Sequence, residues 1–139
     1  MKIYQTKSNK IPSTSYREVH RKAMSEFNKI KALTKRQPHI RSAYFNKNKI
    51  FFTYFWKHLN QKTPRVRLER LKLFTCGIEL VKNSNCHPTS KENPAKKGEI
   101  VHRFYGKTAR GIGFVVQIKE SKRTGRKELM SMFISKAEV

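Results

Sequence analysis

The chain has 139 residues, and its 32 lysine and arginine residues against nine acidic ones give a formal net charge of +23. This excess is larger than solubility requires and predicts a polyanionic partner. Hydrophobic residues make up 37% of the chain, enough for one small core, and no apolar run approaches the roughly 20 residues of a membrane span, so a disordered basic tail and a membrane protein are both excluded.

Residues 1–45 are predicted to form a basic N-terminal arm that contains one helix. Residues 1–49 hold 13 lysines and arginines against two glutamates. Ser15 opens a capping box, and apolar residues then recur at spacings of three and four, which predicts a helix that ends before Pro38. Basic side chains on the other faces of this helix face either solvent or phosphates, and those we assign to nucleic-acid binding are Arg17, Arg21 and Lys22.

Residues 46–139 are predicted to form a single α+β domain. An aromatic strand at residues 50–54 leads into a short helical turn that holds His58. Thr63 is followed by a proline, as at many helix starts, and the apolar stripe that follows predicts one helix as far as the loop. That loop covers residues 83–99, and loops of such length in small domains are more often functional or mobile than inert.

The last third of the chain predicts an antiparallel meander. Alternating apolar residues separated by short turns mark three strands, at residues 100–105, 112–119 and 129–134. In the middle strand Phe114 and its even-numbered neighbours Ile112, Val116 and Ile118 face the helices, which leaves Gln117 and Lys119 on the opposite side as nucleic-acid-binding residues. We therefore expect an α+β fold in which helices pack on one face of a curved antiparallel sheet of about four strands, with a basic helical N-terminal arm and an open, basic second face.

The chain contains no aspartate, since all nine acidic residues are glutamates. Magnesium-dependent nucleases commonly hold the ion with clustered carboxylates, so we expect phosphodiester chemistry here to run without a metal or another cofactor. Cys76 and Cys86 lack a second pair at zinc-finger spacing and are interpreted as free thiols in a reducing cytoplasm. The first residues lack the apolar segment of a signal peptide, which agrees with a cytoplasmic location.

Cleavage of RNA without a metal needs a proton acceptor for the 2′-hydroxyl, a proton donor for the 5′ oxygen, and fixed cations near the phosphoryl oxygens. Arg103 is the candidate phosphate clamp because its planar fork matches two phosphoryl oxygens, and Lys107 follows it in the next turn. The alternative is an arginine on a solvated face of the sheet. His102 shares its side of the strand with apolar residues, which favours a buried structural histidine over a catalytic one.

Three further residues are candidates for the same chemistry. His58 suits proton transfer because the ordinary pKa of histidine is ~6.5, although a surface histidine packed on its apolar neighbours is the alternative. Ser131 either orients a phosphate or fills a tight space, and alternation puts it with Leu129 and Phe133 unless a β-bulge turns it. Tyr105 is a candidate for stacking on a base.

The order of several segments resembles the barnase/EndoU/colicin/RelE-like nuclease superfamily, and more closely its phage-associated branch of mobile elements and toxin systems. The resemblance covers about residues 46–135 and is carried mainly by Trp56-Lys57-His58-Leu59, His102-Arg103-Phe104-Tyr105-Gly106 and Leu129-Met130-Ser131-Met132-Phe133. It implies metal-independent RNA cleavage by a domain with a helix or two on a four-stranded antiparallel sheet. It also implies that His58, Arg103, Lys107 and Ser131 form the catalytic set. Many members have Phe-Pro in the last strand, where this chain has Phe133-Ile134.

Three functions stay open on these observations. The first is a toxin-type endoribonuclease that leaves 2′,3′-cyclic phosphate ends, with His58 exchanging the proton and with Arg103 and Lys107 stabilising the charge. Its substrate would be RNA, free or bound to the ribosome, and a small acidic antitoxin would neutralise it. The second is a non-catalytic RNA- or DNA-binding module, for which charge and aromatic residues are sufficient. The third is a ribosome-associated basic protein.

Overall fold

The computed structural model describes residues 3–135, which form four α-helices and seven β-strands. The helices are α1 (Tyr16–Ala32), α2 (Thr53–Asn60), α3 (Pro64–Leu71) and α4 (Phe74–Asn83). The strands are β1 (Tyr4–Gln5), β2 (His39–Arg41), β3 (Lys49–Phe51), β4 (Thr89–Glu92), β5 (Glu99–Lys107), β6 (Gly113–Ser121) and β7 (Lys127–Ile134). Within this range none of the helices has the length and apolar character needed to cross a bilayer.

All seven strands belong to one mixed and strongly curled sheet. Its strand order is β1-β5-β6-β7-β3-β2, and β4 also pairs with β5. The long centre of the sheet, β5 to β7, is antiparallel, as the alternating sequence predicts. Two pairs are parallel, β1 with β5 and β3 with β7.

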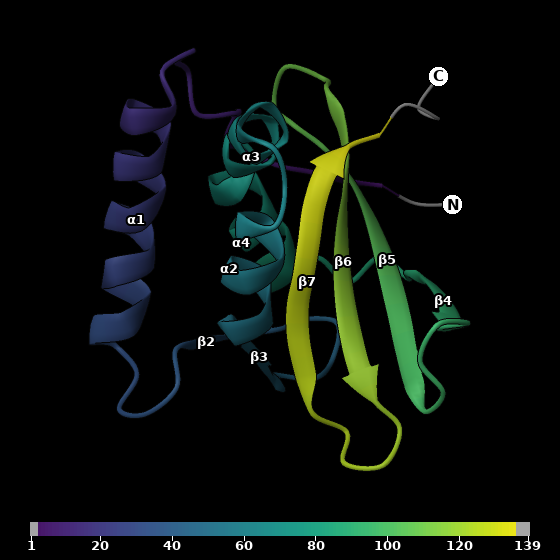
Figure 1. Cartoon of the computed structure of the whole chain (residues 1–139). Coiled ribbons are helices and arrows are strands. Elements are labelled where there is room, and N and C mark those ends of the chain that lie inside the picture. The colour runs from purple at the N-terminus through teal and green to yellow at the C-terminus, as the bar shows by residue number, and fades with distance from the viewer. Residues whose placement is uncertain (1–2, 136–139) are drawn as a thin grey trace.

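The helices and the hydrophobic core lie on one face of this sheet, and α1 is the outermost helix (Figure 1). Phe114, Val116 and Ile118 of β6 are buried in that core as predicted, whereas Ile112 lies before the strand and is partly exposed. Helix α4 packs so closely on the sheet that a Cβ atom at Gly77 would lie within 2.5 Å of a Met132 side-chain atom.

The prediction of about four antiparallel strands is wrong. The additional strands β1, β2 and β4 have two, three and four residues, too few to show an alternating pattern. The parallel pairs join segments that lie far apart in the sequence, and no local pattern reports such a pairing. The predicted loop at 83–99 contains β4, and the predicted strand at 50–54 ends at Phe51, where the chain turns into α2.

The predicted N-terminal arm is also wrong, because this segment is built into the sheet and the core. Its helix begins where the sequence predicts, with the Ser15 hydroxyl accepting the backbone N–H of Glu18 at 3.4 Å. However, the apolar stripe of α1 is buried in the common core, and β1 pairs with β5. The carboxylate of Glu79 on α4 also accepts four hydrogen bonds from β1 and the segment that follows it, from Tyr4, Lys7 and Ser8.

The single helix predicted after Thr63 is two helices. Thr63 caps α3 as expected, its hydroxyl accepting the backbone N–H of Val66. The helix stops at Leu71 because the carbonyl of Lys72 accepts the backbone N–H of Ile11 at 2.8 Å, a partner from the distant N-terminal segment. A break imposed by such a distant partner leaves no sign in the apolar spacing.

Candidate functional site

The face of the sheet opposite the helices carries a row of polar side chains across its central strands. Arg103 of β5 pairs with Gln117 of β6, and Gln117 pairs with Ser131 of β7. Directly opposed residues of antiparallel strands share a face, so the three side chains lie on the same side of the sheet. The next row contains Tyr105 and Phe133. We call this side of the sheet the open face.

A β-bulge places Ser131 in that row. The register between β6 and β7 shifts after Gln117, so that Gln117 pairs with Ser131 while Ile118 pairs with Leu129, and Met130 is the extra residue. Leu129 is fully buried in the core. Ser131 points the other way, and its hydroxyl donates to Oε1 of Gln117 at 2.8 Å. The bulge therefore turns Ser131 to the open face, whereas strict alternation would place it on the core side with Leu129.

Helix α2 runs along the outer edge of β7 and brings His58 to the same surface. Its first turn is fixed to the strand by the backbone N–H of Tyr54, which donates to the Glu128 carboxylate at 3.1 Å. The Tyr54 ring lies under the ammonium group of Lys119, 3.6 Å from the ring centroid, and stacks on His58 at a centroid distance of 5.3 Å. Because Lys119 belongs to the open face, His58 lies at the border of that face.

Two arginines converge on the ring of Phe133. The guanidinium carbons of Arg70 on α3 and of Arg103 lie 5.4 and 5.8 Å from the ring centroid. Within residues 3–135 neither guanidinium forms an ion pair with a carboxylate. Arg70 is only partly exposed, and burial lowers its pKa. Two planar forks without carboxylates suit a phosphate group, which accepts paired hydrogen bonds from arginine.

One of these two cations, Arg70, also acts on His58. Burial lowers the pKa of His58 below the ordinary value of 6.5, and the charges of Lys62, Arg70 and Lys119 lower it further. The imidazole is therefore neutral at pH 7 and able to accept a proton. Its Nδ1 lies 3.4 Å from the Tyr54 hydroxyl. Arg70 thus links the two halves of the site, since its charge acts on His58 while it shares Phe133 with Arg103.

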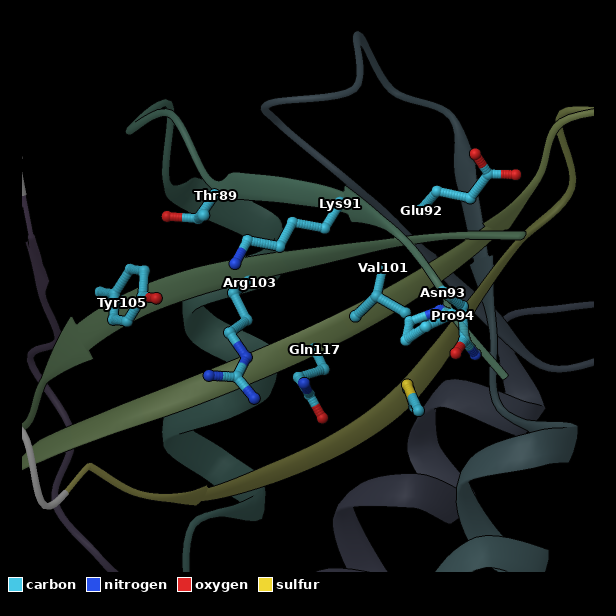
Figure 2. A pocket seen from close by; sticks show the side chains of 10 residues that line it. Thr89, Lys91, Glu92, Asn93, Pro94, Val101, Arg103, Tyr105 and Gln117 are labelled. Atoms are coloured by element: carbon cyan, nitrogen blue, oxygen red, sulfur yellow. The ribbon is translucent and has the colours of Figure 1, made fainter. Parts of the chain in front are cut away.

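A hollow of about 400 Å³ adjoins the row, and residues of β4 line it beside those of the open face. In Figure 2 the side chains of Arg103 and Gln117 lie next to each other and point to the same side of the sheet, with Tyr105 toward the far end. Val101 and Met130 contribute apolar surface. The volume falls within the range of about 300–1,000 Å³ that is typical of small-molecule sites.

Other predicted residues lie farther from this row. Lys107 is on the same side of β5 as Arg103 but four residues along the strand, about 13 Å away, where β5 pairs with β1. Arg17, Arg21 and Lys22 are exposed on α1, the helix farthest from the sheet (Figure 1). The structure therefore groups Arg103, Gln117, Ser131, Tyr105, Lys119 and His58 on or beside the open face, and it separates Lys107 and the α1 cations from them.

His102 lies on the core side of the sheet and is 8% exposed. Its Nδ1 is 2.6 Å from the Ser90 hydroxyl, and its Nε2 is 2.7 Å from the Glu120 carboxylate. The other oxygen of Glu120 lies 3.6 Å from the ammonium group of Lys127. Both ring nitrogens of His102 are therefore occupied by structural partners, as the sequence reading of a buried histidine favours.

Arg70 is the site residue that sequence reasoning missed. It falls beside the apolar stripe of a helix rich in arginine, and such a position is usually a solvated charge. Its position against Phe133 depends on α3 packing along β7, a contact between distant segments. The only local signal is the clustering of three arginines with one glutamate in Pro64–Leu71.

The chain matches no protein-family model, no curated protein and no solved structure. The nuclease resemblance therefore rests on the sequence segments quoted for it. Within residues 3–135 no group of three histidine, cysteine or glutamate side chains is arranged to hold a metal ion.

Proposed function

We propose that the chain is a metal-independent endoribonuclease of toxin type whose open face binds and cleaves an RNA strand. The observation that carries this proposal is the pair of guanidinium groups, Arg70 and Arg103, that meet on Phe133 without a carboxylate and beside a neutral histidine. Arg70 is half-buried, and a half-buried cation without a partner is costly in a folded protein, so an anionic ligand would stabilise it. Arg103 is exposed and can reach the same ligand. The RNA phosphodiester is the anion that the net charge of the chain favours.

The proposed reaction uses these residues as follows. His58 takes the proton of the 2′-hydroxyl while the 2′ oxygen forms a bond to phosphorus and the bond from phosphorus to the 5′ oxygen breaks. The protonated His58 then gives that proton to the departing 5′ oxygen. Arg70 and Arg103 stabilise the charge that grows on the phosphoryl oxygens. The products are a 2′,3′-cyclic phosphate and a 5′-hydroxyl, and no external reactant is consumed.

The remaining residues of the row position the strand. The Ser131 hydroxyl donates to Oε1 of Gln117, so the amide N–H groups of Gln117 would be the ones to donate to the ligand. Tyr105 offers a ring for a base next to Arg103. Lys107, farther along β5, would contact a neighbouring phosphate. The resemblance to the superfamily agrees with this assignment, and it extends the proposal to ribosome-bound RNA, a small acidic antitoxin and a cytoplasmic site of action.

Incubation of total RNA with the purified chain in EDTA tests the proposal. We expect cleavage that leaves 2′,3′-cyclic phosphate ends, falling about 10²- to 10⁴-fold in His58→Ala and about 10²- to 10³-fold in Arg103→Ala. Arg110→Ala is the matched control, because Arg110 is an exposed arginine in the β5–β6 turn, away from the site. RNA that is retarded on a gel but stays intact, with and without ribosomes, would instead identify a non-catalytic binding module.

A further inference from the structure

The open face continues past β7 onto the two strands at the edge of the sheet. Glu128 of β7 pairs with Phe51 of β3, and Phe51 pairs with His39 of β2, so these residues share a face with Lys119. A hollow of about 510 Å³ lies there. We call it the β2–β3 hollow, and the lining residues that matter here are Lys35, Arg36, His39, Lys49, Phe51 and Arg126.

Arg126 is held in a fixed plane at this hollow. Its guanidinium lies over the Phe51 ring, 3.9 Å from the centroid. Its Nη2 donates to Oε1 of Gln37 at 2.6 Å, and its Nε donates to Oε2 of Glu128 at 3.3 Å. The His39 and Phe51 rings also meet in a T-shaped contact, with ring centroids 5.7 Å apart. Three contacts on one exposed arginine fix a flat cationic surface before any ligand binds.

The residues that line this hollow are mostly cationic, although Arg126 itself is paired with Glu128. The β2–β3 hollow is lined by four lysines and arginines and by no glutamate. A second hollow of about 400 Å³ adjoins it and shares Lys49, Phe51 and Arg126, while Lys127 on its other side is buried and paired with Glu120. Flat guanidinium and aromatic surfaces surrounded by cations are the elements with which proteins bind single-stranded nucleic acid, since bases stack on the planes and phosphates pair with the charges.

We infer that the β2–β3 hollow is a second RNA-binding site, which holds an unpaired stretch of the strand that reaches the open face. One base stacks on the guanidinium plane of Arg126, and the adjoining phosphates lie against Lys35, Arg36 and Lys49. The inference depends on the proposed function for the identity of the ligand, and it adds that recognition extends beyond the cleaved bond to single-stranded nucleotides.

The test separates stacking from charge at Arg126. Binding of the full chain to a fluorescent 12-nucleotide single-stranded RNA is measured by anisotropy at several salt concentrations. Arg126→Lys keeps the charge but removes the plane, and we expect about five- to tenfold weaker binding. Arg126→Gln removes the charge as well, and we expect a further loss of affinity. Arg110→Lys and Arg110→Gln are the matched controls, and melting curves confirm that each variant is folded.

Two outcomes overturn the inference. One is an Arg126→Lys variant that binds the single strand as tightly as the unchanged chain. The other is a preference of this surface for duplex RNA or for an acidic peptide, shown by equal or larger effects of Arg126→Lys on those ligands. Cleavage of a dinucleotide, which is too short to span both sites, reports on the open face alone. If the unchanged chain does not cleave the dinucleotide, the proposed function is contradicted. The binding measurements on the Arg126 variants still test whether the β2–β3 hollow binds RNA.

Discussion

Arg103 and His102 are neighbours in β5 and lie on opposite faces of the sheet, and they differ in whether a carboxylate of the chain contacts them. His102 has a partner for each ring nitrogen, and Glu120 beside it also pairs with Lys127. Arg103, on the open face, shares a phenylalanine ring with Arg70, and neither meets a carboxylate within residues 3–135. The charged groups around His102 are thus paired within the chain, whereas Arg103 and its neighbour Arg70 meet no carboxylate in that range.

The difference separates structural charges from binding charges. A buried polar group is stable only when it is hydrogen-bonded, which explains the partners that surround His102. The glutamates on the open face are already neutralised, Glu99 by Lys96 and Lys119, and Glu128 by Arg126. They therefore do not compensate Arg70 and Arg103. Cations without a carboxylate beside a neutral histidine are what the proposed binding of RNA requires.

Removal of Arg70 should have the largest effect on cleavage, and it tests whether the unpaired arginines of the open face serve the reaction. We expect Arg70→Gln to lower RNA cleavage by about 10²- to 10³-fold, because one of the two groups that stabilise the phosphoryl charge is lost. The melting temperature should stay the same or rise, since an uncompensated, partly buried cation is removed. Cleavage rates and thermal unfolding measured on the same samples check both expectations.

The control for this change is Arg65→Gln, which removes an exposed arginine from the same helix. It should leave cleavage within a factor of about two. If Arg70→Gln lowers the melting temperature by several degrees and leaves cleavage at the Arg65→Gln level, then Arg70 is a structural residue, and the distinction between the two faces fails.

On the core side the corresponding change is Glu120→Ala. It removes one hydrogen-bond partner of His102 and the carboxylate nearest Lys127, so we expect the free energy of unfolding to fall by about 2 kcal/mol. Cleavage by the folded fraction should be retained. Urea unfolding measures the first effect, and Glu69→Ala, a change of an exposed glutamate on α3, serves as control. Loss of cleavage without loss of stability would show that the His102 side has a catalytic role.

The sequence predicts the elements whose patterns are local. The capped helix α1 and the antiparallel strands β5 to β7 lie close to their predicted positions, because capping residues and apolar alternation act over a few neighbours. It does not predict the pairing of β1 or the break after Leu71, which depend on backbone contacts between distant segments. An N-terminal segment rich in lysine and arginine was therefore expected to be an arm, although its apolar stripe is long enough to join the core.

The same reason limits prediction of the site. Arg103, Gln117 and Lys119 share the open face because alternation is a local rule. Ser131 joins them only through a bulge, which single-sequence alternation does not locate. Arg70 joins them only because α3 packs along β7, and nothing around it in the sequence separates it from the other arginines of that helix.

The smallest expected effect concerns the pH dependence of cleavage. A base with a lowered pKa stays unprotonated to lower pH, so cleavage should fall only when the pH drops below 6.5, the ordinary value for histidine, and through the lower pKa of His58. Burial, Lys62 and Arg70 contribute more to that lowering than Lys119. In Lys119→Gln the fall should therefore begin at a slightly higher pH, because one nearby positive charge is gone.

The control is Lys57→Gln, which changes an exposed residue of α2 and should leave the pH profile unchanged. If the profile shifts equally in Lys119→Gln and Lys57→Gln, the overall charge of the chain, and not the position of Lys119 beside Tyr54 and His58, sets the pKa of His58. If the profile of His58→Ala is the same as that of the unchanged chain, another group transfers the proton.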